Sequence, residues 1–79
     1  MTKSFYHFLM KFRHPEPNDK ISEFANEAYQ DHGFPKNSFE YDEISDYLEL
    51  NGHYLDSMRI FDEAWELYII QEEKKNYTR

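Results

Sequence analysis

Large apolar residues recur at helical spacing in four segments of this chain, and that spacing is the strongest constraint on its fold. In residues 4–12 the apolar positions are Phe5, Phe8, Leu9 and Phe12. They would form one apolar face of a helix, and Ser4 precedes them in the position of an N-cap. No segment carries a convincing strand pattern, and two glycines are too few for the corners of a small barrel. We therefore expect an all-α domain.

Prolines and glycines set the limits of the first two helices. Residues 14–17 read His-Pro-Glu-Pro and must end the first helix, because proline lacks a backbone donor and disfavours helical geometry in the residue before it. Asn18 or Asp19 would cap the second helix, and Gly33 stands where a left-handed residue would stop it, with Pro35 preventing its resumption. The apolar positions of this second helix are Ile21, Phe24, Ala25, Ala28 and Tyr29.

The third segment has the spacing of a capping box, since Glu40 follows Asn37 by three residues. This spacing predicts a helix that ends near Gly52. Its inward positions would be Tyr41, Ile44, Tyr47 and Leu48.

The last segment predicts the longest helix, from about Tyr54 to about Glu72. Its apolar positions are Leu55, Met58, Phe61, Ala64, Trp65 and Tyr68. The spacing leaves two possibilities open: the helix begins near His53, or residues 53–56 form a separate turn and Ser57 is a new cap. The domain would accordingly have four or five helices, and the tail from about residue 74 should fray.

A chain of 79 residues and 9.8 kDa has room for one core, so we expect a single domain over residues 1–79. Seven Phe, seven Tyr and one Trp supply bulky side chains for this core. We expect Trp65 to anchor it, with a cost of ~3 to 5 kcal/mol on truncation to alanine. The predicted core consists of Phe5, Phe8, Leu9, Phe12, Ile21, Phe24, Ala28, Ile44, Leu48, Met58, Phe61 and Trp65.

Fifteen aromatic residues exceed what such a core needs, so some rings should be partly exposed. The aromatic residues outside the main apolar faces are Tyr6, Phe34, Phe39 and Tyr77. Exposed rings of this kind often anchor protein interfaces.

Charge is divided unevenly along the chain, whose formal net charge is −7. Residues 1–20 carry +2, and residues 74–79 carry +3. Between them, residues 21–73 hold fourteen acidic side chains against Lys36 and Arg59, a net charge of −12. This acidic centre disfavours nucleic acid as a partner, because binding to a phosphate backbone normally needs a basic face.

Several kinds of chemistry are disfavoured by the composition. The chain has no cysteine, so we expect neither disulfides nor thiolate zinc sites, and a cytoplasmic location. No apolar run is long enough to span a membrane, and no signal peptide is recognisable. The paired acids Asp42-Glu43 and Asp62-Glu63 fit a solvated helix surface better than a catalytic pair. The sequence contains neither the turn that carries a nucleophilic serine nor a glycine-rich phosphate loop.

The four histidines have no metal-ligand spacing, and surface or helix-end roles suit them better. They are His7, His14, His32 and His53. We therefore predict no catalytic, cofactor-binding or metal-binding residue and no enzymatic activity.

The order of the sequence motifs resembles the YozE family of small bacterial proteins. The motifs are S-F-Y-H-F-L-M-K-F-R-H-P, I-S-E-F-A-N-E-A-Y, D-H-G-F-P-K, E-I-S-D-Y-L-E-L-N and F-D-E-A-W. The resemblance runs from Ser4 to about Tyr68. It implies a compact helical bundle similar to sterile alpha motif (SAM) domains, found mainly in Gram-positive bacteria. It implies no function, because no activity, cofactor or partner is established for the family.

Two functions are compatible with these observations. The favoured one is a non-enzymatic protein-interaction module that binds through exposed aromatic residues and its acidic surface, with weak self-association as one version. The alternative is a small nucleic-acid-associated regulator that uses a basic face of the first helix. The candidate binding residues are Lys3, His7, Lys11, Arg13, His14, Tyr6 and Phe34. Neither function implies a small-molecule substrate.

Overall fold

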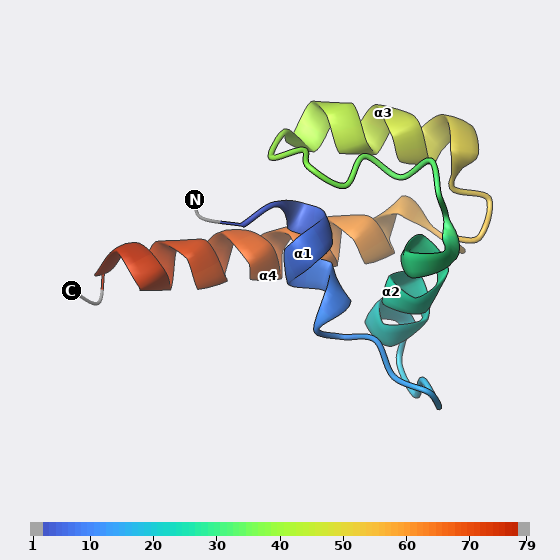
Figure 1. Ribbon diagram of the computed structural model, residues 1–79, viewed down its shortest axis with the longest axis horizontal. Coiled ribbons are helices and arrows are strands. Elements are labelled where there is room, and N and C mark those ends of the chain that lie inside the picture. Colours follow the sequence, from blue (N-terminus) through green and yellow to red (C-terminus); the bar gives the residue numbers. More distant parts are fainter. Residues whose placement is uncertain (1–2, 78–79) are drawn as a thin grey trace.

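The computed structural model describes the backbone of residues 3–77 and the side chains of residues 3–73, and it contains four helices. These are α1 (Phe5–Met10), α2 (Lys20–Gln30), α3 (Tyr41–Asn51) and α4 (Met58–Tyr77). In Figure 1, α4 runs along the longest axis, with α1 crossing it and α2 and α3 at its N-terminal end. The helix α4 contacts each of the other three helices, and α1 also contacts α2. The predicted all-α fold is confirmed.

Side-chain caps start the first two helices as predicted. The backbone N–H of His7 donates to Ser4 Oγ at 3.3 Å, and the Ser4 hydroxyl itself donates to the Lys36 carbonyl at 2.7 Å. Of the two candidate caps for α2, Asp19 is the one used, accepting from the backbone N–H of Ser22 at 2.8 Å. Ser4 therefore caps α1 and also fastens it to the segment before α3.

The predicted end of α2 and the predicted start of α3 are wrong. Gly33 is not left-handed. Helix α2 ends at Gln30, and the Asp31 carboxylate accepts the Gly33 backbone N–H at 3.1 Å. At the start of α3 the N-cap is Glu40 rather than Asn37, and no side-chain cap bond forms.

Ser38 performs part of the role predicted for Asn37. Its hydroxyl accepts from the backbone N–H of Glu40 at 3.1 Å and donates to the Glu43 carboxylate at 2.7 Å. The predicted end of α3 is confirmed, because Gly52 is its C-cap. A Cβ atom at Gly52 would lie 2.7 Å from the Leu48 carbonyl oxygen, so the close approach of the backbone requires glycine there.

Helix α4 begins after a new cap, which decides between the two possibilities for residues 53–57. Ser57 Oγ accepts from the Arg59 backbone N–H at 3.0 Å, and residues 53–56 form no helix. The domain thus has four helices within residues 3–77. At its other end α4 continues to Tyr77, beyond the predicted end near Glu72. The last part of the tail predicted to fray, residues 78–79, lies outside the described residues.

Phe5 lies at the centre of the core. It is fully buried, and its ring contacts five other aromatic rings at centroid distances of 5.4 to 6.4 Å. These rings belong to Phe8, Phe24, Phe61, Trp65 and Tyr68. They come from α1, α2 and α4, so Phe5 joins three helices.

The predicted core is largely confirmed, with corrections at its edge. Eight of the twelve predicted members are buried, and Tyr6 and Phe34 are buried as well, with exposures of only 7% and 3%. Their expected exposure is wrong, because the two rings pack on each other at 5.5 Å. Phe39 is exposed at 42%, as predicted. The half-buried members of the predicted core are Phe12, Ile21, Met58 and Trp65, and the side chain of Tyr77 lies outside the described residues.

Truncation of the central ring should destabilise the domain more than truncation of Trp65. We expect Phe5→Ala to lower the free energy of unfolding by ~3 to 5 kcal/mol, because the substitution leaves a cavity among five rings. Trp65→Ala should cost less, because part of the indole is already in water. Urea denaturation of the two variants measures this order, and a larger loss for Trp65→Ala would contradict the central position of Phe5.

Candidate functional site

The predicted basic face of the first helix is not continuous in the structure. Helix α1 ends at Met10, so the residues after it do not keep the helical spacing. Lys11 turns towards α4, where its Nζ donates to Gln71 Oε1 at 2.8 Å and lies 4.7 Å from the centre of the Phe8 ring. Lys3 is half-buried, and its carbonyl accepts the Tyr68 hydroxyl at 2.7 Å. The exposed His7 lies beside Ser4, with 3.1 Å between Nδ1 and Oγ.

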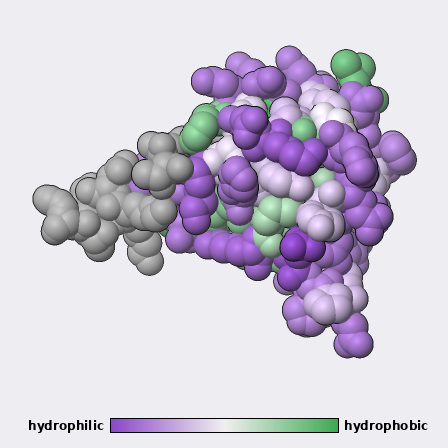
Figure 2. Space-filling model, in the orientation of Figure 1, coloured by the Kyte–Doolittle hydropathy of each residue, from purple (hydrophilic) through white to green (hydrophobic). Residues whose placement is uncertain are grey.

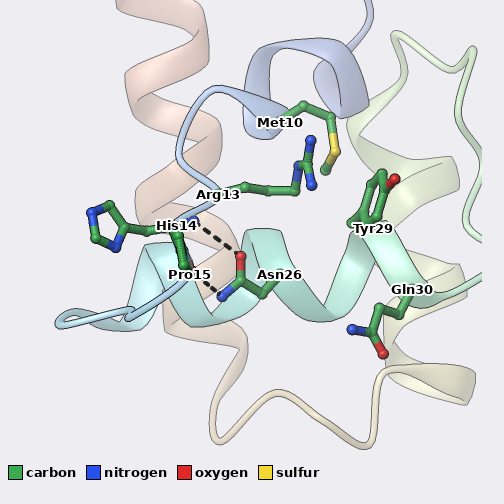
Figure 3. A pocket seen from close by; sticks show the side chains of 7 residues that line it. All are labelled: Met10, Arg13, His14, Pro15, Asn26, Tyr29 and Gln30. Atoms are coloured by element: carbon green, nitrogen blue, oxygen red, sulfur yellow. Dashed lines mark hydrogen bonds between the residues drawn. The ribbon is translucent and has the colours of Figure 1, made fainter.

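Arg13 and His14 instead turn towards α2. The guanidinium carbon of Arg13 lies 3.9 Å from the centre of the Tyr29 ring, a cation–π contact. The Asn26 side chain holds the His14 backbone at both ends: Asn26 Oδ1 accepts the His14 N–H at 3.1 Å, and Asn26 Nδ2 donates to the His14 carbonyl at 2.8 Å (Figure 3). The loop after α1 is thereby fixed on α2.

These contacts form an open pocket between the end of α1 and α2, which we call the Arg13 pocket. It has a volume of about 610 Å³ and is lined by Met10, Arg13, His14, Pro15, Asn26, Tyr29 and Gln30. Figure 3 shows the side chains of Arg13, Met10 and Tyr29 gathered on one side of the pocket, with the His14 ring turned away from them. Among residues 3–73, no carboxylate lies within 4 Å of Arg13.

A second hollow adjoins the first one and shares Tyr29 and Gln30 with it. This Lys36 pocket has a volume of about 580 Å³ and is lined by Tyr6, Tyr29, Gln30, His32 and Lys36. The Lys36 ammonium donates to the His32 carbonyl at 3.2 Å and lies 5.4 Å from the centre of the Tyr6 ring. Burial and the neighbouring Tyr29 raise the pKa of Tyr6, whereas the charge of Arg13 lowers it. Of the predicted site residues, the structure thus groups Tyr6, Arg13 and His14 around Tyr29, and Phe34 lies beneath them as core.

A third hollow, between the start of α3 and α4, was missed as a site by the sequence analysis. This Tyr41 groove has a volume of about 430 Å³ and is lined by Tyr41, Arg59, Asp62, Glu63, Trp65, Glu66 and Ile69. The Tyr41 ring stacks on Phe61 at 5.2 Å and meets the edge of Trp65 at 5.4 Å. Its hydroxyl donates to Asp62 at 2.7 Å, and this hydrogen bond raises the pKa of Tyr41. The only signal in the sequence was that Tyr41 and Trp65 stand at the border between the apolar positions and the acidic positions of their helices.

A carboxylate with two tyrosine donors connects the end of α2 to α3 and to the segment before α4. Asp31 accepts the Tyr47 hydroxyl at 2.7 Å and the Tyr54 hydroxyl at 2.9 Å. Burial opposes ionisation of Asp31, but these bonds and the Gly33 N–H outweigh it and lower its pKa. Burial and the bond to Asp31 raise the pKa of Tyr47 to about 12, and they also raise that of Tyr54. We call these three residues the Asp31 cluster.

The part of the chain that the structure describes holds neither a cluster of metal ligands nor a helix that could cross a membrane. No three histidine, aspartate or glutamate side chains come together there as metal ligands. None of the described helices is both long enough and apolar enough to cross a membrane.

Comparison with known proteins places the chain in a family. Residues 4–70 match the family model described as the YozE SAM-like fold. The chain belongs to the YozE SAM-like family. The resemblance found in the sequence motifs is therefore confirmed, and with it the SAM-like form of the all-α fold.

The relatives are small proteins of Gram-positive bacteria. A UPF0346 protein of Bacillus licheniformis is 71% identical over 72 residues, which cover 91% of this chain and 99% of the relative. The UPF0346 protein YozE of Bacillus subtilis is 67% identical over 66 residues, 84% of this chain and 89% of the relative. A UPF0346 protein of Listeria innocua is 53% identical over 77 residues, 98% of this chain and all of the relative. None of these names states an activity.

The Asp31 cluster should stabilise the fold in a pH-dependent way. We expect Tyr47→Phe to lower the free energy of unfolding by about 1 to 2 kcal/mol, because a charged acceptor loses a donor. Since the pKa of Asp31 is lowered in the folded state, its contribution is present above the ordinary carboxyl pKa and is lost as the pH falls through the folded value. Since the pKa of Tyr47 is raised in the folded state, its contribution to stability is present below about pH 10. This contribution is lost as the pH rises through about 12.

Denaturation of wild type and Tyr47→Phe across this pH range measures both effects. The difference between the two proteins should shrink at acidic pH, where Asp31 is protonated. Tyr29→Phe is a suitable control, because the Tyr29 ring is exposed and its hydroxyl makes no bond with Asp31. An equal loss of stability in both variants, at every pH, would contradict the role of the cluster.

Proposed function

We propose that this domain is a non-enzymatic protein-interaction module, and that the Tyr41 groove is its contact surface. The partner would present a basic side chain next to an apolar one. The observation that supports this proposal is the combination of an aromatic floor with an acidic rim in one open groove.

The floor offers surface that the domain itself does not cover. Tyr41 is 38% exposed although its ring packs on Phe61, and the Trp65 indole is half-buried. The rings are therefore held in place by the core while part of each remains available. Rigid aromatic rings of this kind lose little conformational entropy on binding and commonly dominate interface affinity.

The rim favours a cationic partner. Asp62, Glu63 and Glu66 are exposed along the groove, with Arg59 as its one basic lining residue. A lysine or arginine of the partner could meet these carboxylates and lie over the indole face. The net charge of −12 in residues 21–73 would also accelerate the encounter with a basic protein.

The surface lacks a broad apolar area on the face seen in Figure 2, where hydrophilic residues predominate and hydrophobic ones form small, separate patches. Binding would therefore depend on a few aromatic contacts surrounded by charge. Such an interface suits a short segment of a partner better than a large permanent assembly.

Selection of displayed random peptides on the folded domain tests the proposal. Enriched peptides should pair lysine or arginine with an aromatic or aliphatic residue. We expect the double reversal Glu63→Lys with Glu66→Lys to weaken their binding at least ~10-fold, because opposite charges at the rim become like charges.

A matched control is available on α3. Asp46→Lys with Glu49→Lys changes the same charge at the same spacing on exposed positions that do not line the groove. Peptides without basic residues, or an equal loss in both double variants, would reject the groove as the contact surface. Sedimentation of the domain alone at low and high salt then distinguishes a separate partner from a second copy of the chain.

A further inference from the structure

We propose that the Arg13 pocket binds a phosphate monoester carried by a small molecule, with the Arg13 guanidinium as the group that holds the phosphate. This site shares no lining residue with the Tyr41 groove, and the inference does not depend on the proposed function.

The chemistry of Arg13 carries the inference. Its planar guanidinium presents several N–H donors in a fork that matches two phosphate oxygens. Within residues 3–73 no carboxylate competes for it, since none lies within 4 Å. Its contact with the Tyr29 ring at 3.9 Å occupies one face of the guanidinium and leaves the edges, where the donors are, free for a ligand.

The pocket is formed before any ligand arrives. The two bonds between Asn26 and the His14 backbone fix the loop that carries Arg13, and Pro15 stiffens it. Tyr29, with 52% of its surface exposed, holds the guanidinium from the α2 side. A preformed site loses less ordering entropy on binding, so even a small ligand could bind measurably.

The distribution of charge favours a dianion of small size. Lys36, in the adjoining pocket, is a second permanent cation, and one hydrogen bond to the His32 carbonyl leaves its other N–H groups available. The Asp31 carboxylate attracts Lys36, but it accepts the hydroxyls of Tyr47 and Tyr54, and within residues 3–73 no carboxylate forms an ion pair with Lys36. Two cations suit the charge of a phosphate monoester near neutral pH better than that of a single carboxylate.

A polymeric anion fits less well. The net charge of −7 would repel a long phosphate backbone, and the basic residues of the first segment diverge instead of following one line. By contrast, each pocket has a volume in the range of small-ligand sites, about 610 and 580 Å³. A small phosphate ester with a planar group could occupy the Arg13 pocket and extend past Tyr29 into its neighbour.

Titration of the isotopically labelled full chain with phenyl phosphate, followed by NMR, tests the site. We expect saturable shifts of the Arg13 Nε–H, the Gln30 side-chain amide and the backbone N–H of His14. Inorganic phosphate tests whether the free anion suffices or an ester is needed, and benzoate tests whether a carboxylate serves equally well. The expected order of affinity is phenyl phosphate, then inorganic phosphate, then benzoate.

Variants assign the effect to Arg13. Arg13→Gln should weaken binding of phenyl phosphate at least ~10-fold, and Arg13→Lys should weaken it less, because the charge remains while the fork is lost. Arg59→Gln removes the same charge from the Tyr41 groove and should leave binding unchanged. Both positions are exposed, and thermal melting verifies that the variants are folded.

Three results would overturn the inference. The first is a set of shifts that does not saturate or that survives Arg13→Gln. The second is binding of benzoate as tight as that of phenyl phosphate. The third is tighter binding of a short DNA duplex that depends on Lys11 rather than Arg13, which would favour the nucleic-acid alternative.

Discussion

The burial of the Phe5 ring holds the rest of the structure in place. Helix α1 has only six residues, far too few for a stable helix in water on its own. It exists because Phe5, Phe8 and Leu9 insert between α2 and α4, with Phe5 touching rings from both. The Ser4 cap then fixes its first turn to the segment before α3. A change that loosened Phe5 would therefore weaken the attachment of α1, while the bonds from Asn26 would still hold the loop that carries Arg13 on α2.

Helix α3 is attached differently, and this difference exposes the Tyr41 groove. Among the described helices it packs only on α4, so its first turn lies at the edge of the core. Tyr41 covers one side of Phe61 and leaves the other part of its own ring in solvent. The far part of α3 buries Leu48 in the core, and the bonds from Tyr47 to Asp31 attach it to the end of α2. Because α3 packs on only one of the other described helices, Tyr41 at its start stays partly exposed. The far part of α3 depends on the bond between Tyr47 and the titratable Asp31, so this attachment is sensitive to pH.

The features predicted from sequence were those governed by local rules. Helical spacing identified all four helices, and the caps Ser4, Asp19 and Ser57 follow from short-range bonds. The burial of Tyr6 and Phe34 could not be read in this way, because the two rings cover each other across 28 positions of the chain. Spacing alone treated both as surplus aromatics, although each fills a space that the helices leave open.

The basic residues show the same limit at the level of the site. The basic face was predicted from Lys3, His7, Lys11 and His14, which are four, four and three positions apart and share one helical face only if the helix continues past Met10. Helix α1 ends at Met10, five residues before Pro15, and beyond this end Arg13 and His14 turn to α2 while Lys11 turns to α4. A single stripe suited to a long polyanion is thus converted into a local pocket around one guanidinium. Because this pocket and the acidic groove share no lining residue, a domain with one small core can present opposite charges to two different ligands without neutralising either surface.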